Sequence, residues 1–237
     1  MKKIILAILL ISLCEILSYA QHNGLKDITT FLDIPIDGNK KDLWNKIKEK
    51  GYKQTKFGNT KCLKGRFNGK DVFITIDTNG DKVWRVIVVD GVSYNKNSIA
   101  THFNNLCYHF QDSPKYLSSE NGHQTIPDGE DIDYEMKYNN KRYEAIYFQR
   151  PNKEMEDSLV NKPAFGDLRP MVINGELDSL PEDKRNDIIT DAYYKRYLEI
   201  ASKKLVWFKI QEFGTGEYRI AIYYENVYND GANGEDL

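Results

Sequence analysis

The stretch CLKGRFNGKDVFITIDTNGDKVWRVIVVD, residues 62 to 90, decides the fold of this chain. It contains three runs rich in apolar residues, at 62–67, 71–77 and 82–90. The breaks between them are Asn68-Gly69 and Thr78-Asn79-Gly80-Asp81. Asn-Gly pairs are typical of type I′ turns in tight hairpins, because both residues accept positive φ angles. The stretch therefore predicts an antiparallel three-stranded meander.

Two helices are expected beside this meander, one before it and one after it. Leu43 and Ile47 recur at helical spacing, lysines occupy the other face, and Gly51 ends the element. The second helix is expected over 96–111, with Asn95 as its cap. Its apolar stripe consists of Ile99, Phe103, Leu106 and Phe110. We expect this stripe to pack on the meander.

The second half of the chain is less regular. Residues 131–138 alternate between apolar and charged side chains, which predicts a half-buried strand. It is expected to pair with 141–149 across Asn139-Asn140 as a second hairpin. Prolines and glycines interrupt residues 151–178, which we interpret as an irregular insertion with a short helix around Asp157.

A third, longer helix and a last hairpin complete the expected fold. Ser179 and Glu182 form a capping-box pattern, so the helix is expected to start there and to reach about Lys203. Its stripe consists of Ile189, Tyr193, Tyr197 and Ile200. The final strands are expected at 205–213 and 217–226.

These elements predict an α+β fold in which antiparallel meander sheets pack against helices. A helix followed by strands occurs twice, which suggests two related α/β units. The expected divisions are a signal peptide at 1–20, a helix-plus-meander unit with the second helix at 21–115, a second unit at 116–226 and a polar tail at 227–237. The predicted core consists of Leu43, Ile47, Val72, Ile74, Phe103, Leu106, Phe110, Ile189 and Ile200.

The first twenty residues indicate export. Lys2-Lys3 precedes the apolar run Ile4–Leu13, and Ser18-Tyr19-Ala20 offers the small residues that a signal peptidase reads. Cleavage would leave Gln21 as the first residue of a periplasmic or secreted protein with no membrane span. The alternative is a lipoprotein acylated at Cys14, although Leu13 stands where a small residue is usual.

The charge balance restricts the class of partner. The chain has 33 Lys and Arg against 35 Asp and Glu, and a pI near 6.1. Because the whole chain supplies no net basic field, a nucleic-acid partner is not expected. Two cysteines remain after leader cleavage, Cys62 and Cys107, and they are expected either to pair or to pack as free thiols.

Sequence signatures of catalysis and of metal binding are missing. The chain has no G-x-S-x-G elbow, no glycine-rich phosphate loop and no close Cys or His pairs, so no cofactor or metal is expected. His102 and His109 lie about two helical turns, roughly 10 Å, apart and are interpreted as surface side chains of the second helix. Residues 77–81 resemble a calcium loop, but Val88 stands at the position of the twelfth-residue Glu.

One acidic cluster and one aromatic patch deserve a functional interpretation. The acids are Asp128, Glu130, Asp131 and Asp133, which we interpret as a solvated loop. In the last hairpin, residues of one parity are apolar, whereas the other parity carries aromatic and cationic side chains. The candidate partner-binding residues on that second face are Trp207, Lys209, Arg219 and Tyr223. Coverage of this face by the third helix is the structural alternative.

Four segments carry a resemblance: FLDIPIDG at 31–38, KVWR at 82–85, FNNLC at 103–107 and YNDGANGEDL at 228–237. With the leader, they resemble an uncharacterised family of exported proteins from gut-type Gram-negative bacteria. The order of elements is similar to that of β-lactamase-inhibitor-protein and PepSY-like folds, a likeness of fold alone. The resemblance assigns no activity to any residue. We expect a non-catalytic exported binding protein that is inhibitor-like or binds an envelope partner, which would be a protein, a peptide or a glycan. The alternative is an extracytoplasmic hydrolase with carboxylates from distant segments.

Overall fold

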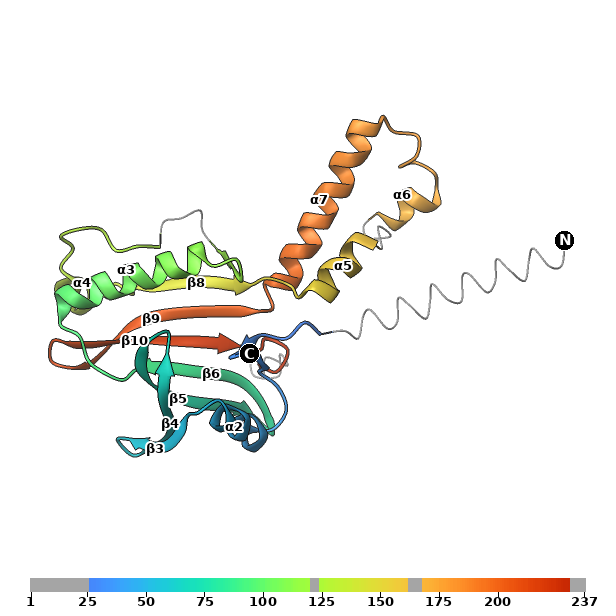
Figure 1. The fold of residues 1–237 in the computed structure, drawn as a ribbon. Helices are drawn as coiled ribbons and strands as arrows, with labels where there is room; N and C mark the ends of the chain where they lie inside the picture. The colour runs from blue at the N-terminus through green and yellow to red at the C-terminus, as the bar shows by residue number, and fades with distance from the viewer. Residues whose placement is uncertain (1–25, 120–123, 162–167, 231–237) are drawn as a thin grey trace.

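The computed structural model describes residues 26–119, 124–161 and 168–230 (Figure 1). The expected leader at 1–20 and the end of the tail, from residue 231 onward, lie outside these residues. An eight-stranded antiparallel sheet forms the body of the molecule. Its strands, in spatial order, are β3 (Lys53–Phe57), β4 (Thr60–Phe67), β5 (Lys70–Asn79), β6 (Lys82–Asp90), β10 (Glu217–Glu225), β9 (Leu205–Gly214), β8 (Glu144–Gln149) and β7 (Tyr116–Ser118). The predicted α+β class with helices packed on antiparallel sheet is confirmed.

The sheet consists of two four-stranded meanders that meet at β6 and β10. The predicted turn at Asn68-Gly69 joins β4 to β5, and both of its residues have positive φ, 50° and 78°. The 77–81 segment is the β5–β6 turn, as its hairpin interpretation predicts. The meanders form one continuous sheet, so both halves of the chain contribute to one core.

Edge strand β3 has no counterpart in the sequence prediction, because its residues alternate weakly. It pairs with β4, but β4 pairs with β5 only from Leu63 onward. The tip of the β3–β4 hairpin therefore leaves the sheet, and Phe57 stacks on Phe73 of β5 with ring centroids 4.6 Å apart.

Two predicted helices pack on one face of the sheet. Helix α2 (Lys40–Glu49) begins at Asn39 and buries Leu43 and Ile47. Helix α3 (Lys96–Asp112) begins at Asn95, whose side chain accepts hydrogen bonds from two backbone N–H groups of the first turn. The predicted position of α3 on the first meander is wrong. Phe103 contacts Phe208 of β9 at 5.0 Å between ring centroids, so α3 covers the second meander instead.

The predicted strand at 131–138 is wrong, because these residues form helix α4 (Ile132–Tyr138). Asp131 caps the helix by accepting a hydrogen bond from the backbone N–H of Tyr134. Ile132 is buried and Met136, four residues on, packs against the same core. The alternation was misleading, because Tyr134 and Tyr138 are apolar by type yet point to solvent.

The predicted insertion and the predicted third helix together form a helical arm that projects from the sheet (Figure 1). It contains α5 (Lys153–Asn161), which includes the predicted helix at Asp157, α6 (Arg169–Ile173) and α7 (Glu182–Ala201). The predicted capping box is wrong. Pro181 occupies the cap position without a side-chain bond, whereas the Ser179 hydroxyl donates to the carbonyl of Glu176. Ile200 is buried in the arm, but Ile189 is only half-buried.

The remaining described segments close the core. A small hairpin, β1 (Thr30–Phe31) and β2 (Ile34–Pro35), places Phe31 against Phe67 and Tyr224. Cys62 and Cys107 are buried free thiols. Within the described residues, no helix is long and apolar enough to cross a membrane.

Candidate functional site

The two faces of the sheet differ in what covers them. Helices α2, α3 and α4 contribute side chains to the core on one face. Helices α5 and α7 pack on each other and contact the sheet at Leu117 of edge strand β7. The central strands therefore carry no helix of the described chain on their second face, which we call the open face.

Five residues form a row across the open face, one from each of five neighbouring strands. In register from β5 to β8 they are Thr75, Ile87, Tyr223, Trp207 and Ile146. Ile146 is 39% exposed, and Trp207 is half-buried. The row is thus mostly apolar, and solvent reaches it at Ile146 and at Trp207.

Two predicted site residues are the centre of this row. The rings of Trp207 and Tyr223 stack with centroids 4.1 Å apart and an interplanar angle of 10°. Tyr223 is buried, and its hydroxyl accepts a hydrogen bond of 2.9 Å from Gln211 Nε2. Burial raises the pKa of Tyr223, so it is a neutral phenol at physiological pH.

Cationic side chains flank the stacked pair. Lys209 Nζ lies 5.4 Å from the centroid of Trp207 and 5.6 Å from that of Tyr223. The guanidinium of Arg85 lies 3.7 Å from the ring of Trp84 and 5.3 Å from that of Tyr223. These distances are within the range of cation–π attraction. Both cations are half-buried beside the aromatic rings.

Glu225 holds Trp207 and Arg85 in place through hydrogen bonds. Its Oε1 accepts hydrogen bonds from Trp207 Nε1 at 2.7 Å and from the Arg85 guanidinium at 2.5 Å. One buried carboxylate thus orients an aromatic and a cationic side chain at once. The alternation of side chains along β9 predicted the position of Trp207. It did not identify Arg85, which lies on β6, or Glu225, which is the last residue of β10.

The fourth predicted residue, Arg219, does not join this cluster. Its guanidinium lies 4.9 Å from the ring of Phe57 and 5.2 Å from that of Phe213. It also donates to Ser93 Oγ at 3.1 Å and to the carbonyl of Asp90 at 2.9 Å. Arg219 therefore connects the tip of the β3–β4 hairpin to the tip of the β9–β10 hairpin. The structure brings together the other three predicted residues, Trp207, Lys209 and Tyr223.

The acidic cluster has local structural partners. Glu130 accepts hydrogen bonds from Lys141 and Tyr143, and the bonds outweigh its partial burial, so its pKa is lowered. The hydrogen bond from Lys96 lowers the pKa of Asp131. Asp133 behaves in the same way, because Lys137 donates to it at 2.7 Å. All three carboxyls are therefore held ionised, which suits helix capping and not general-acid chemistry.

His102 is not the surface histidine that we predicted. Its side chain is 10% exposed, and Nε2 lies 3.1 Å from both carboxylate oxygens of Asp90. On the other side, Lys70 Nζ lies 2.8 Å from Nδ1, and Tyr94 packs on the imidazole ring at 4.6 Å. Asp90 also accepts from the backbone N–H of Ile220. The group ties α3 to β5, β6 and β10, which is a structural role.

The two thiols are poor nucleophiles where they lie. Burial raises the pKa of the Cys107 thiol to about 11. Burial also raises the pKa of Cys62. Since the thiolate is the reactive species, neither side chain is activated for catalysis.

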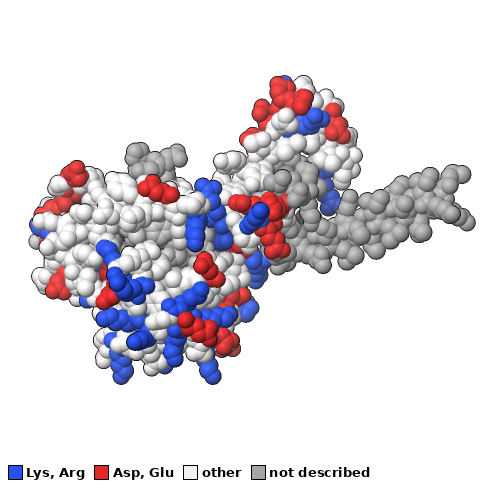
Figure 2. All heavy atoms as spheres, in the orientation of Figure 1, with Lys and Arg blue, Asp and Glu red and all other residues white. Residues whose placement is uncertain are grey.

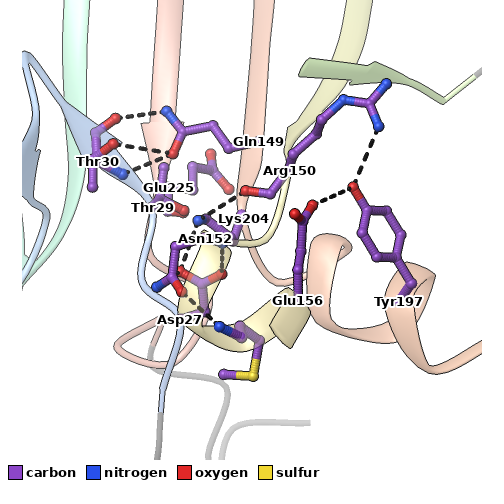
Figure 3. A network of polar contacts seen from close by, with 11 residues as sticks. Asp27, Thr29, Thr30, Gln149, Arg150, Asn152, Glu156, Tyr197, Lys204 and Glu225 are labelled. Atoms are coloured by element: carbon purple, nitrogen blue, oxygen red, sulfur yellow. Dashed lines mark hydrogen bonds and ion pairs between the residues drawn. The ribbon is translucent and has the colours of Figure 1, made fainter. Parts of the chain in front are cut away.

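A second polar cluster lies where the arm leaves the sheet (Figure 3). Lys204 Nζ donates to Asp27 Oδ1 at 2.7 Å, and both side chains are almost fully buried. Asn152 donates its backbone N–H to the same carboxylate at 2.8 Å, and Lys204 also reaches the carbonyl of Arg150 at 3.1 Å. An adjoining cleft of about 480 Å³ is lined by these residues and by Lys26, Lys115 and Gln149. The cluster fastens residue 27 to the base of the arm.

No group of three or more His, Cys, Asp or Glu side chains within the described residues is arranged to hold a metal ion. Comparison of the chain with family models, curated proteins and solved structures finds no match. The open face, with its aromatic and cationic cluster, is therefore the candidate site.

Proposed function

We propose that this chain is a non-catalytic exported binding protein that holds a protein partner against its open face. The observation that carries the proposal is the Trp207–Tyr223 stack, which lies at the centre of a row accessible to solvent and has cations at its side. Trp, Tyr and Arg are the residue types that dominate the binding energy of protein interfaces. Export rests on the expected leader at 1–20.

A protein partner is favoured over a polyanion because the centre of the open face has mixed charge. Glu225 neutralises Arg85, and Lys209 lies in register with Glu144. Protein interfaces combine aromatic anchors with such paired charges at the rim. A peptide or a glycan is the other outcome of the test.

The hydrolase alternative has less support. Such an enzyme needs one carboxyl group that stays protonated beside one that is ionised. The pKa values of Glu130, Asp131 and Asp133 are all lowered, so this cluster supplies no acid. The binding proposal requires no such pair.

The experiment compares three purified proteins as bait in an envelope extract: the mature chain, Trp207→Ala and Tyr138→Ala. Tyr138 is the matched control, because it is an aromatic side chain with 73% exposure on α4, which packs on the helix-covered face. We expect the mature chain and the control to capture the same protein and Trp207→Ala to lose it. With that protein purified, calorimetry should give a loss of about 2 kcal/mol or more for Trp207→Ala. Equal capture by all three baits would overturn the proposal, as would capture that glycosidase treatment abolishes.

A further inference from the structure

A second surface, separate from the centre of the open face, carries a strong positive charge. Residues 40–70 contain eleven Lys and Arg against two Asp and Glu, a net charge of +9. The whole chain has 33 Lys and Arg and 35 Asp and Glu, so the rest of it has 22 Lys and Arg against 33 Asp and Glu, a net charge of −11. All eleven cations are exposed. Figure 2 shows Lys and Arg gathered over the end of the molecule with α2, β3 and β4, whereas the tip of the arm carries Asp and Glu together with some Lys and Arg. We call these eleven side chains the basic edge.

Most of the basic edge has no acidic partner. Lys64 pairs with Asp71 at 3.8 Å. Among the described residues, no Asp or Glu lies within ion-pair distance of any lysine of α2 or β3, and Lys61 lies over the ring of Trp44 at 5.4 Å. Most of these cations therefore have no ion pair with an Asp or Glu among the described residues.

The β3–β4 hairpin places like charges directly opposite each other. Lys53 is in register with Lys64, and Lys56 is in register with Lys61. Such pairs destabilise an antiparallel ladder. Lysines on an edge strand prevent sheets from pairing edge to edge, but that role does not account for the four lysines of α2. An anionic partner would relieve this repulsion and neutralise both elements together.

We propose that the basic edge binds the anionic headgroups of a phospholipid bilayer. Ten of the eleven cations are lysine, a point charge, whereas arginine is the residue suited to the bidentate recognition of nucleic acids and carboxylates. The cations lie on α2 and on both sides of the hairpin, at the end of the sheet. A flat surface can approach such an end without a groove. A long flexible polyanion would extend past it onto the acidic remainder of the molecule.

The first test is sedimentation of the mature chain with vesicles. Mixed phosphatidylglycerol–phosphatidylcholine vesicles are compared with pure phosphatidylcholine at about 50 mM and about 500 mM salt, because screening separates electrostatic from apolar binding. We expect binding to the anionic vesicles alone, weakened at least about tenfold by the higher salt. Equal binding to both vesicle types would overturn the proposal, as would tighter binding of duplex DNA than of anionic vesicles at the same salt.

The second test removes four unpaired lysines of the basic edge. Lys46, Lys48, Lys53 and Lys56 are replaced together by Gln. The control replaces four exposed lysines elsewhere, Lys115, Lys137, Lys153 and Lys184, with the same change in net charge. A lysine near an anionic surface contributes roughly a factor of five in affinity, so the first variant should bind at least about tenfold more weakly and the control far less so. Equal weakening in both variants would overturn the assignment, and if the first variant fails to fold, the vesicle comparison with the mature chain decides alone.

Discussion

Phe208 and Trp207 are neighbours on β9, yet they lie in different environments. Phe208 is fully buried on the helix-covered face, where it contacts the rings of Phe103, Phe110 and Tyr147. Trp207 points to the open face, stacks on one tyrosine and remains half-buried. Both faces are rich in aromatic residues. Composition therefore does not distinguish the helix-covered face from the open face, whereas the presence of a covering helix does.

The largest expected effect tests this contrast directly. Phe208→Ala removes a fully buried ring and should lower the free energy of unfolding by about 3–5 kcal/mol. Trp207→Ala removes a half-buried ring, one stacking contact and one hydrogen bond to Glu225, and should lower it by about 2 kcal/mol. Urea denaturation of both variants measures the difference. If the two losses were equal, the open face would be a second core and the binding proposal would fail.

Much of the fold could be predicted from the sequence, because several turns and helix starts are determined by one or two residues. Asn68-Gly69 demands positive φ at both positions, and Asn95 offers a capping oxygen directly before an apolar stripe. The strand predicted at 131–138 failed because alternation does not separate a buried Ile132 from an exposed Tyr134. The position of α3 also could not be predicted, since it depends on β6 pairing with β10 and not with a strand adjacent in sequence.

The next effect concerns the end of the helix-covered face, where the segment from Asp27 leads into the buried residues of β1 and β2. Lys204→Met leaves the buried carboxylate of Asp27 without its cation, which should lower the free energy of unfolding by about 3 kcal/mol. Lys203→Met is the matched control, because the neighbouring ammonium is 40% exposed and pairs loosely with Glu199 at 3.9 Å. We expect it to change stability by about 0.5 kcal/mol or less. Thermal or urea unfolding that gave similar losses for both variants would contradict the anchoring role of the ion pair.

A smaller effect is expected from pH at the opposite end of the covered face, around α4. Hydrogen bonds from lysines lower the pKa of Asp131 and of Asp133 in the folded state. The ionised carboxylates therefore stabilise the fold above about pH 4, and this contribution is lost as the pH falls through their lower folded-state values. Asp133→Asn should be less stable than the parent at neutral pH and should lose less stability on acidification. Melting temperatures measured between about pH 6 and about pH 2 test this, with the exposed Asp128→Asn as the control for one lost charge.

The candidate site was only partly accessible to sequence reasoning. Parity along the last hairpin placed Trp207, Lys209 and Tyr223 on one face, because alternation is a local property of strands. Parity could not show that Arg219 is held by Phe57 and Phe213, because that contact depends on how the β3–β4 hairpin leaves the sheet. The basic edge was present in the sequence, but a net charge near zero for the whole chain concealed it.

The smallest expected effect is the coupling energy between Lys209 and Trp207 on the open face. Lys209 lies over both stacked rings, and a partly exposed cation–π contact contributes about 0.5–1 kcal/mol. A double-mutant cycle of Lys209→Met and Trp207→Leu, measured by urea unfolding, should give a coupling energy in that range. Coupling energies inside a core are larger, because buried partners share their whole packing surface. A value of about 2 kcal/mol or more would mean that the cluster stabilises the fold, whereas the expected small value leaves its surface available to a partner.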